Sequence, residues 1–140
     1  MKPTEAVLLK FLREVDGDFY PPLSQKTDLN LFAGKMLANA DFFYKQSDSG
    51  DIIGLVAVYA NDWEKKYAYI PLVAVSPFYR RLGVANKLLL AALDYVASLG
   101  SKIQTIGIHT NNSVAVKLYQ NIGFKSVNIE DGRTYMEIKL

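Results

Sequence analysis

The sequence contains no cysteine and only one histidine, His109. The absence of cysteine excludes a disulfide framework, a thiolate metal site and a catalytic cysteine. Because only one imidazole remains as well, the usual ligands of zinc are missing, and we expect chemistry that uses no metal.

The chain also lacks a strong charge of one sign and long apolar runs. Its 140 residues include sixteen basic and fourteen acidic ones, for a formal net charge of +2, with no basic tail or block. We therefore expect neither nucleic acid nor a membrane as a partner. Lys10, Arg13 and Glu14 interrupt the apolar residues near the N-terminus, unlike a signal peptide or a membrane helix, so we expect a cytoplasmic protein.

Hydrophobic periodicity predicts a chain of alternating helices and strands. Half of the residues are apolar, and the length suits one domain spanning residues 1–140. Helices are expected at 4–15, 29–40, 84–99 and 111–122, and strands at 41–46, 52–60, 67–75, 102–110, 125–130 and 134–140. The segment 17–27 is expected to be a loop. Pro71 cannot donate a ladder hydrogen bond, so we expect interrupted pairing within the strand at 67–75.

The segment RRLGVA, residues 80–85, joins a strand to a helix that has no ordinary capping box. A helix start exposes N–H groups without partners and carries partial positive charge, which suits an anion. Gly83 removes a side chain at the closest point, and Arg80 and Arg81 add charge suited to phosphate. Alternatively, Gly83 only relieves a tight turn and both arginines are solvated.

Neither the P-loop pattern nor the Rossmann fingerprint is present. The segment instead resembles the acyl-CoA pyrophosphate loop of the GCN5-related N-acetyltransferases (GNAT), at Arg80, Gly83 and Ala85. The resemblance extends over about residues 28–140. It includes VAVSP before the loop, and after it the residues Asn112, Ala115, Leu118, Tyr119, Gly123 and Phe124.

This resemblance implies an α/β (α+β) fold, with a mixed sheet of about six strands, helices on both faces, and a splay between the two central parallel strands. It implies acetyl-CoA as co-substrate, a primary amine of a small molecule or peptide as acceptor, and no metal; it leaves a homodimer open. The residues implied in CoA binding are Val73, Val75, Arg80, Arg81, Leu82, Gly83, Val84, Ala85 and Asn112.

The same resemblance places Tyr119 beside the departing sulfur and a main-chain N–H near Val75 as the oxyanion donor. On reference pKa values, a phenol would transfer its proton to a thiolate uphill by about 2 kcal/mol, so hydrogen bonding can matter as much as protonation. Tyr119 also fits a helical core stripe. Asn112 is a natural helix cap as well as a pantetheine contact.

The sequence departs from the family at the general base. Many members have a glutamate on one of the two splayed strands, but Tyr69 and Gly107 stand at those positions. His109 lies on the same strand face as Gly107 and is our candidate base, with a structural histidine as the alternative. Asp62 and Glu64 lie on the turn between the predicted strands at 52–60 and 67–75. They are further candidates for the base or for groups that hold a cationic acceptor, and the alternative is that they are solvated charges.

Two other features bear on the acceptor and on activity. The chain begins with a helix where the family usually has a strand, and Phe19, Tyr20 and Leu23 either shape an acceptor pocket or pack the core. Because both glutamates are missing, a second hypothesis is a non-catalytic acyl-CoA-binding module.

Overall fold

A computed structural model describes residues 1–19 and 21–140. The helices are α1 (Glu5–Val15), α2 (Leu23–Lys26), α3 (Leu29–Asn39), α4 (Val84–Ser98) and α5 (Ser113–Ile122). The strands are β1 (Asp41–Gln46), β2 (Ile52–Asp62), β3 (Tyr67–Val75), β4 (Thr105–Thr110), β5 (Lys125–Glu130) and β6 (Arg133–Lys139). The predicted order of helices and strands is thus confirmed, apart from α2.

The short helix α2 lies in the segment expected to be a loop. The side chain of Asp16 accepts hydrogen bonds from the backbone N–H of Ser24, at 2.8 Å, and from its hydroxyl. Leu23 is buried against the N-terminal helices. These contacts hold a single helical turn whose four residues are too few to give a periodic pattern.

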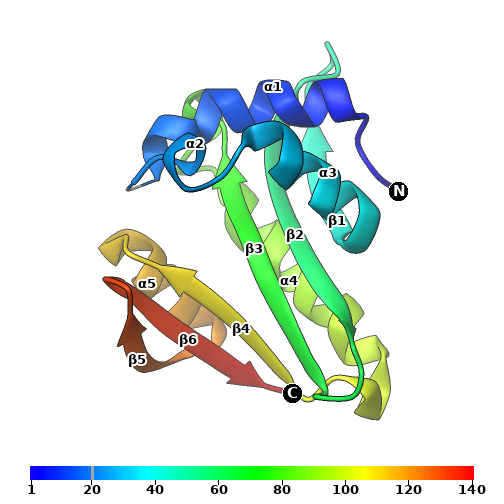
Figure 1. Cartoon of the computed structure of the whole chain (residues 1–140), viewed down its shortest axis with the longest axis vertical. Coiled ribbons are helices and arrows are strands. Elements are labelled where there is room, and N and C mark those ends of the chain that lie inside the picture. The colour runs from blue at the N-terminus through cyan, green and yellow to red at the C-terminus, as the bar shows by residue number, and fades with distance from the viewer. Residues whose placement is uncertain (20) are drawn as a thin grey trace.

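The six strands form one mixed sheet in the order β1-β2-β3-β4-β6-β5. All neighbouring strands are antiparallel except β3 and β4, which are parallel. Helices α1 and α3 cover one face of β1–β3, whereas α4 and α5 lie on the other face (Figure 1). The expected six-stranded sheet with helices on both faces is confirmed.

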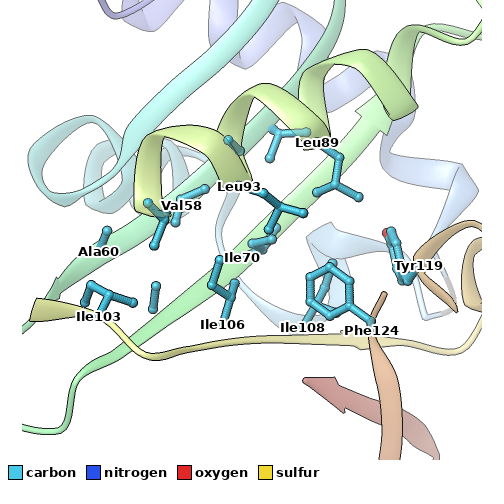
Figure 2. Close-up of a cluster of buried hydrophobic side chains, with 14 of the residues drawn as sticks. Val58, Ala60, Ile70, Leu89, Leu93, Ile103, Ile106, Ile108, Tyr119 and Phe124 are labelled. Carbon is cyan, nitrogen blue, oxygen red and sulfur yellow. The ribbon is translucent and has the colours of Figure 1, made fainter. Parts of the chain in front are cut away.

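Each face of the sheet has its own core. Figure 2 shows the cluster between the sheet and helices α4 and α5, which includes Ile70, Leu89, Ile106, Ile108 and Phe124. Gly54 on β2 lets α4 approach closely, because a Cβ atom there would lie 2.6 Å from Cγ1 of Val84. This approach fixes the start of α4 against the sheet.

The parallel pairing of β3 with β4 is short. It runs only from Tyr67 opposite Thr105 to Ile70 opposite Ile108, and Pro71 is the first residue of β3 beyond it. At the same point β3 has a bulge, in which Ile70 and Pro71 together lie opposite Val58 of β2. The upper ends of β3 and β4 therefore diverge, as Figure 1 shows and as expected from Pro71 and the family resemblance.

Three strands differ from the prediction at their boundaries, and the smallest difference is that β6 spans Arg133–Lys139 instead of 134–140. β2 continues to Asp62, and β4 begins at Thr105 instead of residue 102, because Gly100–Lys102 form a 3-10 turn. Within residues 1–19 and 21–140, no helix combines the length and apolar character needed to cross a membrane.

Candidate active site

A cleft of about 440 Å³ lies where β3 and β4 separate. Residues 69–75 of β3 form one wall, and residues 108–112 with Val114, Ala115 and Tyr119 form the other. Among the described residues, its remaining lining consists of Asp18, Phe19, Leu23, Lys26, Arg80 and Arg133. The cleft is thus bounded by the strands that the sequence predicts to splay.

The backbone of β3 turns polar groups toward this cleft. The N–H of Ser76, just after β3, donates to the carbonyl of Ile53 in β2, at 2.7 Å. Peptide groups alternate in direction along a strand, so those of Val73 and Val75 point away from β2. Because β4 pairs with β3 only up to Ile70, these groups lie beyond the parallel ladder and remain directed at the cleft.

Arg80 is anchored to the protein at the end of this wall. Its Nε and Nη2 each lie 3.2 Å from the carbonyl oxygen of Val75, and Nη2 also pairs with the carboxylate of Asp18. The carboxylate offsets part of the guanidinium charge, so Arg80 presents less free charge than the sequence pattern suggests. It still lines the cleft.

The start of α4 is open, as the sequence predicts. Gly83 is the N-cap residue with φ of 76°, and no side chain of residues 1–19 or 21–140 caps the helix. The first helical bond runs from Lys87 N–H to the Gly83 carbonyl, at 3.1 Å, which leaves the N–H groups of residues 84–86 without helical partners. A Cβ on Gly83 would meet no described atom within 4 Å, so the glycine satisfies the turn and also leaves room for a ligand.

Asn112 caps α5. Its Oδ1 accepts from the N–H of Val114, at 2.8 Å, and of Ala115, at 3.2 Å. Asn112 also lines the cleft, so both of its predicted roles are compatible with its position.

Tyr119 lies in the core and also lines the cleft. Its side chain is 5% exposed, and its ring packs on Phe124 with centroids 5.9 Å apart. Figure 2 shows the hydroxyl oxygen directed away from Phe124, and it makes no hydrogen bond within the described part of the chain. Burial raises the pKa of Tyr119 well above its ordinary value, which favours a neutral hydrogen-bond donor.

His109 lies on the opposite face of the sheet from Tyr119. Its Nδ1 is 2.7 Å from the Tyr69 hydroxyl, and its Nε2 is 2.9 Å from Oε2 of Glu130. The ring of Tyr135 packs on the imidazole with centroids 4.8 Å apart. Tyr69 and His109 both line the cleft, at the end where β3 and β4 still pair.

The second position at which the family often has a glutamate is filled by neighbouring tyrosines. The hydroxyls of Tyr67 and Tyr135 lie 2.6 Å apart, and Tyr135 donates to Glu137 at 2.9 Å. A Cβ on Gly107 would lie 1.9 Å from the Tyr67 hydroxyl oxygen. No side chain fits there without displacing this pair.

The remaining candidates differ in position. Asp62 accepts from Lys65 N–H at 3.2 Å and stabilises the β2–β3 turn, which Figure 1 places at the end of β3 opposite to the diverging strands. Neither Asp62 nor Glu64 lines the cleft.

Phe19 and Leu23 line the cleft and also pack with the N-terminal helices, and Tyr20 lies outside the described residues. Among the described residues, no group of three or more His, Cys, Asp or Glu side chains is placed to hold a metal ion.

Comparison with known proteins decides the family. The model of the Acetyltransferase (GNAT) family matches residues 9–124. The chain belongs to the GNAT acetyltransferase family. The expected family and fold are therefore confirmed, and the match begins within α1, earlier than the sequence motifs indicate.

Curated relatives of this GNAT domain include GCN5-related N-acetyltransferase 4, chloroplastic, of Arabidopsis thaliana. The two are 38% identical over 74 residues, which are 51% of this chain and 25% of that protein. An uncharacterized N-acetyltransferase of Methanocaldococcus jannaschii is 26% identical over 106 residues, 72% of this chain and 46% of that protein. The chain thus spans between a quarter and half of the length of these relatives.

Solved structures share the fold over nearly the whole chain. The PaiA N-acetyltransferase of Thermoplasma acidophilum, in complex with coenzyme A, has a TM-score of 0.78 at 19% identity, covering 97% of this chain and 92% of that one. A Pyrococcus horikoshii protein has a TM-score of 0.79 at 21% identity, covering 100% and 95%. A GNAT fold of this kind therefore accommodates coenzyme A.

Proposed function

We propose that this GNAT domain is an acetyl-CoA-dependent N-acetyltransferase that moves an acetyl group directly from the thioester to a primary amine of a small molecule or peptide. The observation that carries this proposal is the cleft between β3 and β4, which has an open helix start near it, Tyr119 on one side of the sheet and His109 on the other.

The open start of α4 would bind the CoA pyrophosphate. Its first N–H groups, which have no partner within the helix, and its partial positive charge suit an anion, and Gly83 allows a close approach. The full set of proposed CoA-binding residues is Val73, Val75, Arg80, Arg81, Leu82, Gly83, Val84, Ala85 and Asn112. Within this set, the peptide groups of Val73 and Val75 would bond the pantetheine arm along β3.

The groups around the cleft would divide the chemistry between the two faces of the sheet. The N–H of Val75 would polarise the thioester carbonyl, as an oxyanion donor does. Tyr119 would donate a hydrogen bond to the departing sulfur. His109 would accept the proton that the acceptor ammonium loses, and the departing thiolate would take the second nitrogen proton once the nitrogen–carbon bond has formed and the carbon–sulfur bond has broken.

A non-catalytic acyl-CoA-binding module is the second candidate. The observation that favours it is the absence of a carboxylate at Tyr69 and Gly107, where many family members have their general base. The hydrogen-bonded His109 favours catalysis, because it supplies a titratable group at the cleft.

Two measurements separate these functions. CoA should raise the midpoint of thermal unfolding in either case, because a ligand that binds the folded state stabilises it by mass action. Only the enzyme should release free thiol from acetyl-CoA across a panel of primary amines. An unmoved midpoint at millimolar CoA would contradict both candidates, and a raised midpoint without amine-dependent thiol release would favour the binding module.

A further inference from the structure

We propose that Tyr69 contacts the acceptor amine and passes its proton to His109, which Glu130 orients, so that a Tyr69–His109–Glu130 relay replaces the missing glutamate base. The inference rests on the proposed acetyl transfer. It makes Tyr69 the catalytic residue in contact with the amine and Glu130 a positioning residue.

The position of Tyr69 favours this direct contact. Tyr69 pairs with Gly107 one step before the last parallel pair, Ile70 opposite Ile108, so it stands where the cleft reaches the closed end of the ladder. Tyr69 and His109 line the cleft, but Glu130 does not. The phenol of Tyr69 and the imidazole of His109 are therefore the groups that a bound amine can reach, and the carboxylate of Glu130 lies behind them.

The hydrogen bonds fix the direction of the relay. An ionised carboxylate only accepts, so Glu130 requires the proton of a neutral imidazole to lie on Nε2, 2.9 Å away. Nδ1 is then an acceptor, and the Tyr69 hydroxyl, at 2.7 Å, must donate to it. Arg133 also acts on the phenol oxygen as a hydrogen-bond donor, and the remaining lone pair can take a proton from the cleft side. This arrangement presents a base to the amine through Tyr69.

The proton balance is complete without another reactant. An ammonium acceptor gives one proton to Oη of Tyr69 while the Tyr69 proton moves to Nδ1 of His109. The neutral amine then attacks the thioester, forming the nitrogen–carbon bond and releasing the thiolate, which takes up the second nitrogen proton. Overall an ammonium ion and a thioester give an amide, a thiol and one proton. His109 holds that proton and returns it to solvent, since its side chain is 14% exposed and that of Glu130 47% exposed.

Charged and aromatic groups around the relay also bear on its pH dependence. Burial raises the pKa of Tyr69, and the nearby positive charge of Arg133 opposes that rise and favours transient loss of the phenol proton. Arg133 also acts on Lys26, whose pKa burial and this charge both lower. The titratable and charged groups that face His109 or its partners are Tyr67, Tyr69, Glu130, Arg133, Tyr135, Glu137 and Lys26.

The chain offers a matched control for Tyr69. Tyr67 lies on the same strand and face, and its hydroxyl bonds Tyr135 instead of His109. Tyr69→Phe should lower turnover by roughly 10²-fold or more, as for loss of a positioned base, with CoA affinity by calorimetry unchanged. Tyr67→Phe should change turnover by less than about threefold, and equal losses in both variants would overturn the relay.

The acceptor itself provides a second readout. Aliphatic primary amines are ammonium ions at neutral pH, whereas aniline and hydroxylamine are largely neutral and need no proton removed before attack. Tyr69→Phe and Glu130→Gln should therefore impair transfer to the aliphatic amines more than transfer to aniline or hydroxylamine. A uniform loss across these acceptors would show that both residues serve only the structure.

His109 is the only histidine of the chain, so its NMR signals need no assignment among several. At a pH where the ring is neutral, ¹⁵N shifts should report a proton on Nε2 and none on Nδ1, and Tyr69→Phe should move mainly the Nδ1 signal. A proton on Nδ1 would overturn the relay even if the enzyme is active. Conversely, the unsubstituted protein could show the expected proton on Nε2 and yet transfer no acetyl group to any amine. That result would overturn the proposed function, and the hydrogen bonds of Tyr69, His109 and Glu130 would then serve only the structure.

Discussion

Replacing Tyr119 by Phe tests whether its hydroxyl donates a hydrogen bond to the departing sulfur, on the face of the sheet opposite to His109. The change removes one hydroxyl, which forms no hydrogen bond within the described chain, and keeps the ring on Phe124. Stability should therefore change by less than about 1 kcal/mol, because no intramolecular hydrogen bond is lost.

The effect on turnover follows from the pKa of the phenol. On reference values, proton transfer from a phenol near 10 to a thiolate near 8.5 is uphill by about 2 kcal/mol. Burial raises the pKa of Tyr119 further, so complete transfer costs more, and a hydrogen bond to the thiolate is the better description. A hydrogen bond to a charged group contributes about 1.5–3 kcal/mol, which corresponds to a loss of roughly 10- to 150-fold in turnover.

The assay is turnover at saturating acetyl-CoA and amine, with CoA affinity by calorimetry and the unfolding midpoint measured on the same samples. Tyr59→Phe is the control, since the Tyr59 hydroxyl is buried without a partner in the described structure and lies outside the cleft. Unchanged turnover in Tyr119→Phe would remove this hydroxyl from the mechanism. A loss far beyond about a thousandfold would instead show that Tyr119 transfers its proton completely.

Three further substitutions test other parts of the site. Gly83→Val should abolish the rise in unfolding midpoint on adding CoA and cost roughly 1–2 kcal/mol of stability, because φ is 76° there; complete unfolding of the free protein would indicate a role in the turn alone. His109→Gln should lower acetyl transfer and alter the pH–rate profile, and an unaltered profile would make the histidine structural. Gly107→Ala should destabilise the protein by about 1–3 kcal/mol in denaturant titrations, since the new Cβ meets the Tyr67 hydroxyl; an unchanged denaturation midpoint would show that the tyrosines move aside freely.

The features that the sequence predicts well are those set by local pattern. The continuous apolar runs give β2 and β3, and Pro71 marks the point where pairing with β4 stops. The open start of α4 follows from Gly83 and the lack of a capping side chain. Each of these depends on a few consecutive residues and on backbone preferences that act within them.

The contacts that define the proposed base depend on distant residues and could not be predicted. Glu130 reaches His109 only because the β5–β6 hairpin has a register shift between Ser126 and Asn128, which decides the face on which later residues lie. Arg80 likewise pairs with Asp18, 62 positions earlier in the chain. The sequence does show a carboxylate at the end of the predicted strand at 125–130, but not that β6 lies between this strand and β4, nor which face Glu130 occupies.

The bulge at Ile70 and Pro71 has a consequence for how far this fold can be stabilised. Replacing Pro71 by a residue with an N–H group would give β3 another donor next to β4, and a longer ladder would add hydrogen bonds to the free protein. Those bonds would use the same strand edge that the proposed CoA site requires. Selection for thermal stability alone should therefore favour longer pairing between β3 and β4. Selection for ligand binding should instead preserve the unpaired ends of these two strands.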